Sequence, residues 1–195
     1  LYYNNSVTGM TATNVQAAID ELKAEASAQI TPYIVGKDSW DPFSSIQAAI
    51  TQAVTDGHGP GNPALVLVKP GDYTENVAAK PAINVIASGS TRLIGTLTYS
   101  CTTGTLSGNQ ASWQGIDVIS AAPAVGSLVF GGTAPQKLFI VSANVDSANA
   151  NPALEMNNSG TGSNLVASNI KFYNTSTGFA GKIDAGALTL VGSQT

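Results

Sequence analysis

From residue 33 onward the chain is a succession of short apolar segments separated by Gly, Asn, Ser and Pro, and this succession most limits its possible folds. The segments are ALVLV at 64, INVIA at 83, RLIGTLTY at 92, GIDVIS at 115, SLVFGG at 127, KLFIVSANV at 137, PALEM at 152, NLVASNIKFYN at 164 and GALTLVG at 186. Short apolar runs bounded by turn-forming residues are typical of β-strands. Although the spacing shows no strict repeat, the series suits stacked solenoid coils, in which each coil buries its inner face on its neighbours.

The composition fits an all-β or solenoid protein better than a helical enzyme. Charged residues are 10% of the 195 residues, against about 25% in a typical globular protein, while the hydrophobic share of 43% is near normal. The formal net charge is -4 and no Lys or Arg cluster occurs, which argues against nucleic-acid binding. No apolar run approaches the roughly 20 residues that span a bilayer, so membrane insertion is not expected.

The ends of the sequence also carry an expectation. Residue 1 is Leu, no signal peptide is visible, and the terminal LVGSQT continues a strand-like pattern. We therefore expect the chain to be a segment of something longer, truncated at its C-terminus.

A helix is predicted over residues 44–56, before the first long apolar strand. Its apolar positions recur at steps of three and four and form one face: Ile46, Ala49, Ile50, Ala53 and Val54. Ser44 and Gln47 have the spacing of a capping box, and Asp56 with Gly57 should end the helix. We expect this helix to cap the open end of the coils.

A second helical pattern lies in TATNVQAAIDELKAEASAQ, within the first 31 residues. Thr13 and Gln16 again have capping-box spacing. One stripe runs along the helix through Ala12, Val15, Ile19, Leu22, Ala26 and Gln29. At about four or five turns, the isolated helix is marginal in water, so the stripe must be covered. The cover is either the rest of the same chain or further copies of it in a short coiled coil.

The run SVTGMTATNVQAAIDEL, over roughly residues 5–25, resembles a segment that recurs in phage fibre and other virion appendage proteins. The resemblance implies a trimeric coiled coil that leads into a fibre domain. It makes 1–31 an oligomerisation and attachment segment, with Val15, Ile19, Leu22 and Ala26 at the interface between copies. The number of copies follows from the resemblance alone, because Ile at a and Leu at d favour two strands.

A second resemblance covers roughly residues 33–99. FSSIQAAI, followed by LVLVKPGDYTENV and INVIASGSTRLIGTLTY, resembles the opening of pectin-lyase-like proteins. These include pectinesterases, polysaccharide depolymerases and many phage spikes, and they share a right-handed parallel β-helix. We therefore predict an all-β, pectin-lyase-like β-helix over 32–195, with the capping helix near 44–56. One fold can host many unrelated activities, so the resemblance is weak evidence for an activity.

The sequence offers few catalytic groups. The signature stretches that bring paired aspartates and an arginine together in pectinesterases do not occur after residue 100, and Arg92 is the only arginine. Asp117 and Asp146 are isolated; they could form a carboxylate pair on adjacent coils, as a glycosidase needs, but solvent-facing turn aspartates are the commoner explanation. We therefore predict no catalytic residues.

Metal and cofactor sites are not predicted either. With one His and one Cys, a tetrahedral zinc site of these residue types cannot be assembled within one chain. His58 lies in a loop rich in turn formers, and Cys101 suits a small buried filler. Asp72 and Glu75 could bind a cation, but a turn residue and a strand-edge charge explain them as well. No Gly-rich run has phosphate-loop spacing.

Four aromatic residues are the best candidates to stack on sugars: Trp40, Tyr99, Trp113 and Tyr173. Aromatic residues are also routine in protein cores and interfaces, so each has two interpretations.

Together these features predict a structural, non-enzymatic phage virion appendage, a tail, head or neck fibre or spike, on the outside of the particle. It would be a homotrimer that contacts other virion proteins and attaches to the host surface, with host-surface polysaccharide as a further partner. The alternatives are a pectin-lyase-like polysaccharide depolymerase and a carbohydrate-binding module.

Overall fold

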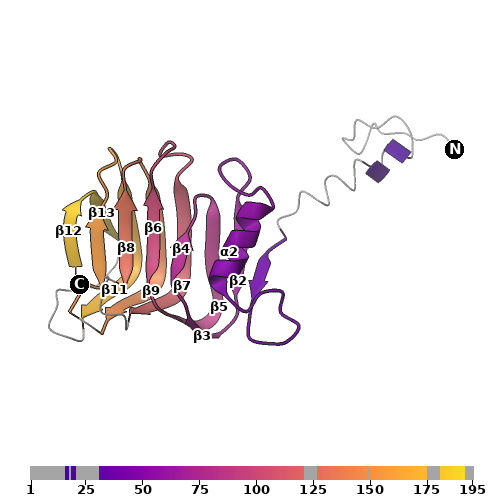
Figure 1. Cartoon of the computed structure of the whole chain (residues 1–195), viewed down its shortest axis with the longest axis horizontal. Coiled ribbons are helices and arrows are strands. Elements are labelled where there is room, and N and C mark those ends of the chain that lie inside the picture. Colours follow the sequence, from indigo (N-terminus) through magenta and orange to yellow (C-terminus); the bar gives the residue numbers. More distant parts are fainter. Residues whose placement is uncertain are drawn as a thin grey trace. The chain divides into compact units, whose positions relative to one another are not determined.

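The computed structural model describes residues 16–17, 19–20, 31–120, 127–148, 150–174 and 181–191, and for 182–185 the backbone alone (Figure 1). The chain divides into two units, Leu1–Thr31 and Pro32–Thr195. In the first unit residues 16–17 and 19–20 are helical, and Gln16 Nε2 donates a hydrogen bond to Asp20 Oδ1 at 3.0 Å. The Ile19 side chain is 44% exposed. The other three predicted interface residues, Val15, Leu22 and Ala26, lie outside the described residues.

The second unit is mostly β, and its described part holds one α-helix, α2 (Ile46–Thr55). The strands are β1 (Tyr33–Val35), β2 (Ala64–Val68), β3 (Gly71–Thr74), β4 (Val77–Ala79), β5 (Ile83–Ile94), β6 (Leu97–Cys101), β7 (Gln110–Ser120), β8 (Leu128–Gly132), β9 (Lys137–Ser147), β10 (Leu154–Asn157), β11 (Asn164–Asn174), β12 (Gly181–Ala185) and β13 (Ala187–Val191). Each apolar segment singled out in the sequence overlaps these strands, but RLIGTLTY is divided between the end of β5 and the start of β6.

The strands form two parallel sheets whose members alternate along the chain. One sheet has the order β1-β2-β5-β7-β9-β11-β13, with β3 beside β5, and the other has the order β12-β10-β8-β6-β4. From β4 onward, successive strands of one sheet are separated in sequence by a strand of the other, and the chain winds as a parallel β-solenoid (Figure 1). The structure describes no helix that is long and apolar enough to cross a membrane.

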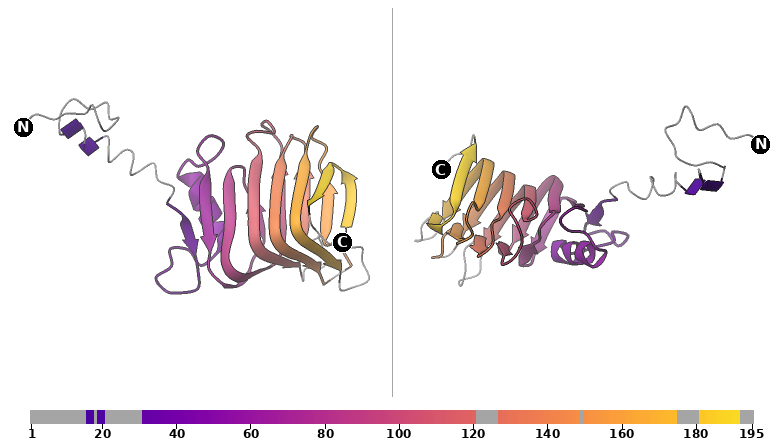
Figure 2. Two further views of the ribbon diagram at one scale, coloured as in Figure 1. Left: turned by 180° about the vertical axis from the view of Figure 1, so that it is seen from behind. Right: turned by 90° about the horizontal axis from the view of Figure 1, so that it is seen from above.

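The long strands bend partway along their length, as Figure 2 shows from behind. At the bend β7, β9 and β11 each have a residue with positive φ: Gly115 at 72°, Ser142 at 52° and Asn169 at 51°. These residues are 27 apart, and so are the paired residues that begin β7, β9 and β11. We call the half of each long strand before the bend the first face, together with β1, β2 and β13, and the half after it, with β3, the second face. A regular coil thus exists without a visible sequence repeat.

The backbone conformation at the bend predicts how a substitution there changes stability. Ser142 adopts a left-handed conformation that costs a non-glycine residue roughly 1–2 kcal/mol. Replacing Ser142 by Gly should raise the free energy of unfolding by about 0.5 kcal/mol, since Gly removes this cost but loses more entropy on folding. Ser168→Gly, in the extended part of β11, is the matched control and should lower it by roughly 0.5–1 kcal/mol. Denaturant titration measures both values, and a loss of stability in both variants would contradict the prediction.

The inner side of the coils holds apolar residues at alternate strand positions, as in the buried, half-buried, buried pattern of β2. The corners contain a row of buried polar residues instead: Asn109, Gln136 and Ser163, again 27 apart. Gln136 Oε1 accepts a hydrogen bond from the Cys101 N–H at 2.7 Å, and Asn109 Nδ2 donates to the Pro135 carbonyl at 2.9 Å. These side chains form hydrogen bonds with backbone N–H and C=O groups at the turns between strands, where no neighbouring strand supplies a partner.

The predicted helix exists, but its start differs in detail from the prediction. Ser45, not Ser44, is the N-cap residue, and its Oγ accepts the Ala48 N–H at 3.2 Å. Gln47 does not form the predicted capping box, because its Oε1 accepts a hydrogen bond from the N–H of Ala78 in β4 at 2.7 Å. A side chain on the helix thus binds a neighbouring strand.

The apolar side of α2 packs against β1, β2 and β4. Its buried residues are Ile46, Ala49, Ile50 and Ala53. Val54 was expected on the same face but is 46% exposed, because it lies at the margin of the stripe. The helix ends as predicted, with Asp56 as C-cap residue and Gly57 at a φ of 86°.

Candidate functional site

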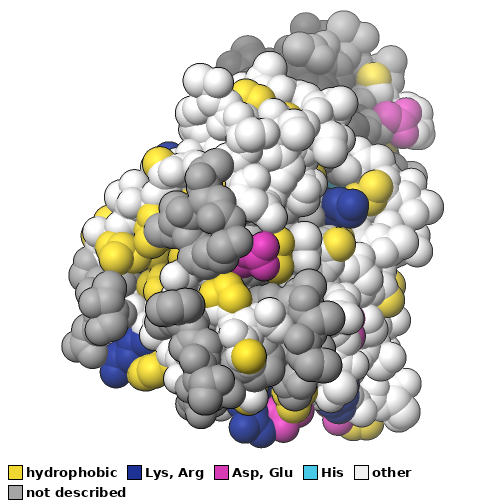
Figure 3. All heavy atoms as spheres, turned by 60° about the vertical axis from the view of Figure 1, so that its left-hand side comes forward, with side chains coloured by type: hydrophobic (Ala, Val, Ile, Leu, Met, Phe, Trp, Pro, Cys, Tyr) yellow, Lys and Arg dark blue, Asp and Glu magenta, His cyan; other side chains and the backbone are white. Residues whose placement is uncertain are grey.

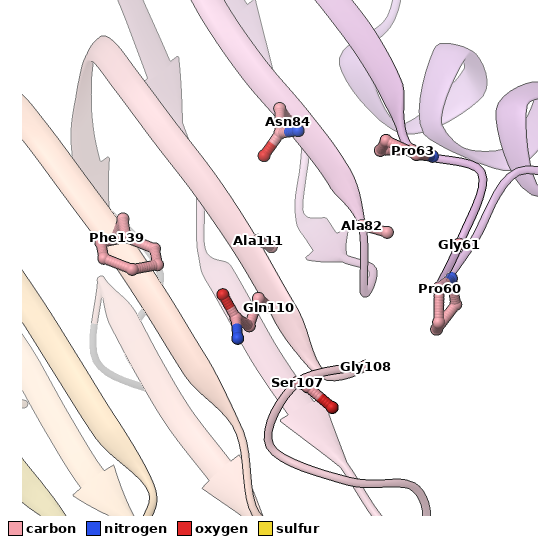
Figure 4. Close-up of a pocket in the computed structure, with 10 residues that line it drawn as sticks. All are labelled: Pro60, Gly61, Pro63, Ala82, Asn84, Ser107, Gly108, Gln110, Ala111 and Phe139. Atoms are coloured by element: carbon pink, nitrogen blue, oxygen red, sulfur yellow. The ribbon is translucent and has the colours of Figure 1, made fainter.

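A groove of about 300 Å³ opens on the outer side of the first face (Figure 4). Its floor comes from β5, β7 and β9, and its walls come from the loops before β2 and before β7. The side chains that matter below are Asn84, Gln110 and Phe139 on the floor, and Pro60, Pro63 and Ser107 on the walls. Figure 4 shows the first three along neighbouring strands, with the two prolines across from them. None of the described residues that line the groove is charged.

Cross-strand pairing fixes the floor of the groove. Asn84, Ser112 and Phe139 lie in register on β5, β7 and β9. Ser112 Oγ donates to Asn84 Oδ1 at 2.8 Å, so the amide nitrogen is the donor that Asn84 can offer to a ligand. Gln110 pairs with Lys137, whose Nζ lies 4.7 Å from the Phe139 ring centroid. The arrangement joins an aromatic ring to two amides on a rigid sheet.

Charged side chains are few on one side of the molecule, whereas the groove has the Lys137 ammonium next to its floor. On the part of the surface seen in Figure 3, acidic and basic side chains are few and lie scattered among polar and apolar ones. The groove offers an aromatic ring and amide groups, with the Lys137 ammonium next to the ring, and such a lining is suited to a ligand with hydroxyl groups.

Two of the four predicted sugar-contact residues need correction. Trp113 and Tyr99 have no exposed surface, because they occupy inward positions of β7 and β6. Trp113 Nε1 donates to the Ile116 carbonyl at 3.0 Å, and Tyr99 stacks on Phe130 with ring centroids 6.2 Å apart. Burial also raises the pKa of the Tyr99 hydroxyl. Both rings belong to the core and cannot meet a ligand on the surface.

The other two aromatic residues are accessible but far apart in the sheet order. Trp40 is 76% exposed in the loop after β1, and Tyr173 is 43% exposed on β11. The loop of Trp40 is held by Asp41, which accepts from Lys69 Nζ at 2.5 Å and from the Asp38 N–H at 3.0 Å. The hydrogen bond from Lys69 is the main reason that the pKa of Asp41 lies below its usual value.

A row of charged and amide side chains crosses the second face. It consists of Asp72, Arg92, Asp117, Asn144 and Lys171, on five neighbouring strands. Arg92 binds Asp72 with both ends of its fork, Nε to Oδ1 at 2.8 Å and Nη2 to Oδ2 at 2.5 Å, and thereby lowers the pKa of Asp72. Asp117 Oδ1 accepts the Asn144 N–H at 2.7 Å and its Nδ2 at 3.0 Å. Most of the row is thus paired internally.

Asp146 lies next to this row. It pairs with Ile119, two residues along β7 from Asp117, so the two isolated aspartates are on adjacent strands. Its Oδ1 is buried and has no hydrogen-bond partner in the described part of the chain. The structure therefore brings Asp117, Asp146 and Arg92 onto one face, which the sequence left open.

The remaining polar candidates have structural partners. Glu75 accepts hydrogen bonds from the start of α2, and Asp72 binds Arg92, so neither is free for a cation. His58 Nδ1 lies 3.2 Å from the Asn62 carbonyl oxygen, and Cys101 is buried. Among the described residues no group of three or more His, Cys, Asp or Glu could hold a metal ion.

The sequence analysis missed Phe139, Asn84 and Gln110, the residues on the floor of the groove. Strand alternation could have found Phe139, because Leu138 and Ile140 on either side of it are buried.

No protein-family model matches this chain, and no curated protein or solved structure matches it either. A functional assignment therefore rests on the residues and their geometry.

Proposed function

We propose that the chain is a structural, non-enzymatic subunit of a phage virion appendage, a fibre or spike on the outside of the particle that attaches to the host surface. The supporting observation is a parallel β-solenoid that follows a helical segment with a 44% exposed Ile19. The resemblance of SVTGMTATNVQAAIDEL to virion appendage segments supports the same assignment. Other virion proteins are the expected partners at the attached end.

The finer architecture belongs to this proposal. Val15, Ile19, Leu22 and Ala26 form the seam of a trimeric coiled coil. The solenoid is right-handed, as nearly all strand-crossover-strand connections between parallel strands are. The α2 helix caps one end of the coils, which its packing on β1, β2 and β4 supports.

Trimerisation gives the attachment its strength. Each copy carries one groove on its first face, so a homotrimer presents three identical sites to a repetitive surface polymer. Linking weak sites raises the effective concentration for the second and third contacts, so the assembly binds far more tightly than one copy.

A polysaccharide depolymerase is the second candidate, and one observation favours it. Asp117 and Asp146 lie on adjacent strands of the second face, with Arg92 beside Asp117. Glycosidases use two carboxylates on either side of the scissile bond. Against this role, Asp117 already accepts two hydrogen bonds from Asn144.

Polysaccharide cleavage separates the two candidates. We expect the full chain, incubated with pectin and with a panel of bacterial capsular polysaccharides, to release no more reducing or unsaturated ends than a heat-denatured sample. An Asp117→Asn, Asp146→Asn double variant should behave in the same way. Cleavage by the native chain that is lost in the double variant would establish the depolymerase and overturn the structural assignment.

A further inference from the structure

We propose that the groove on the first face is a subsite for one pyranose residue of a polysaccharide. The ring of the sugar stacks on Phe139, and its hydroxyl groups bind the amides of Asn84 and Gln110. This inference deepens the proposed attachment function and rests on it for the origin of the polysaccharide.

The chemistry of the floor matches a pyranose. A pyranose has an apolar face of C–H groups and a rim of hydroxyls that both donate and accept hydrogen bonds. Phe139 supplies an aromatic surface, while Gln110 offers an amide that can donate and accept and Asn84 offers its amide nitrogen. The residues that line the groove are uncharged, and the Lys137 ammonium lies next to the floor, with Nζ 4.7 Å from the Phe139 ring centroid. The volume of about 300 Å³ lies at the small end of the range of ligand sites.

The walls of the groove are held by backbone hydrogen bonds. In the loop before β2, the N–H groups of Gly59 and Asn62 each donate to the other's carbonyl, at 3.0 and 2.9 Å. In the loop before β7, the Thr105 carbonyl accepts from the N–H groups of Gly108 and Asn109, at 3.1 and 2.8 Å. A site that exists before the ligand arrives loses little entropy on binding.

The Phe139 ring is not part of the core, although Lys137 Nζ lies over it, 4.7 Å from the ring centroid, so the sugar stacks on the other face of the ring. Phe139 points outward from β9 and is half-buried, whereas the core is filled by its neighbours Leu138 and Ile140. An outward aromatic side chain can be removed without leaving a cavity in the core, so a binding defect can be separated from a folding defect.

Saturation-transfer difference NMR on the full chain tests the subsite. The probes are glucose, galactose, mannose and N-acetylglucosamine, each in large excess. We expect transfer to the ring protons of at least one sugar, a roughly tenfold weaker response in Phe139→Ala, and a clearly weakened one in Phe139→Leu, which keeps apolar bulk but has no aromatic face. Val54→Ala, which removes a 46% exposed apolar side chain from α2, is the control and should respond as the native chain does.

Circular dichroism must show that each variant keeps its β content. No transfer to any of the four sugars, or an undiminished response in both Phe139 variants, would overturn the subsite. A native trimer that adsorbs to bacterial cells but shows no such transfer would remove this inference and leave the attachment function standing. A native chain that is not a trimer and does not adsorb to cells, but still shows sugar transfer, would overturn the attachment function and leave the subsite standing.

Discussion

Replacing Ile19 and Leu22 together by Asp is expected to convert the proposed trimer into single chains while the β content stays unchanged. Both positions belong to the apolar stripe of the first 31 residues, and Ile19 is 44% exposed within its own chain. Packing of three copies would bury six carboxylates along one seam, at a cost of several kcal/mol each unless they were protonated. Multi-angle light scattering measures the mass, and far-UV circular dichroism measures the β content.

Because the chain has two separate units, loss of the trimer can be distinguished from unfolding of the solenoid. Residues 1–31 and 32–195 are separate compact units, so a change in the first should not unfold the solenoid. Asn14→Asp combined with Ser27→Asp is the matched control, because it adds the same number of acidic residues and the same charge off the stripe. The control should keep the native mass. If the Ile19 and Leu22 variant also kept it, the stripe would not be the interface.

Glu75→Ala is expected to lower the free energy of unfolding by about 2–3 kcal/mol, which is the value for a buried or half-buried charged acceptor that loses several hydrogen bonds. Glu75 lies in the turn between β3 and β4, and its carboxylate accepts from Ser45 Oγ at 2.7 Å and from the Ile46 and Gln47 N–H groups at 2.7 and 2.9 Å. It therefore satisfies donors at the start of α2 from a position some 30 residues away.

The position of the carboxylate explains the size of this effect. The first turn of a helix carries unpaired N–H groups and the positive end of the helix dipole, and α2 has no acidic residue of its own there. Glu75→Gln should fall between the native chain and Glu75→Ala, because it keeps one acceptor oxygen without the charge. Glu155→Ala, on the outer side of β10, is the control and should change stability little. Thermal and denaturant unfolding measure the free energy of unfolding of all three variants. If Glu75→Ala had the same free energy of unfolding as the native chain, the contact between Glu75 and α2 would contribute nothing to stability.

Local sequence pattern was sufficient for most strands and for α2, because alternation and turn residues act over a few positions. β12 (Gly181–Ala185) has no counterpart among the predicted strands, since GKIDA carries two charges in five residues and resembles a loop. Its pairing with β10 makes it a strand. The 27-residue coil was equally hidden, because the residues at the bends are Gly115, Ser142 and Asn169, which share a backbone conformation and no side chain.

The candidate site was less predictable than the fold, for a physical reason. A parallel solenoid brings together residues one coil apart, so Asn84, Gln110 and Phe139 meet only once the register is known. The same holds for Glu75 and α2. Residue type alone also selected Trp113 and Tyr99 as surface aromatics, whereas strand alternation places both in the core. Exposed Trp40 and Tyr173 stay as predicted sugar contacts.

The mass of the native full chain in solution tests the proposed trimer most directly. Native mass spectrometry, with each chain contributing 19.8 kDa, should find three chains in one particle. A single-chain mass at all concentrations would contradict a fibre or spike subunit and would favour a monomeric carbohydrate-binding module.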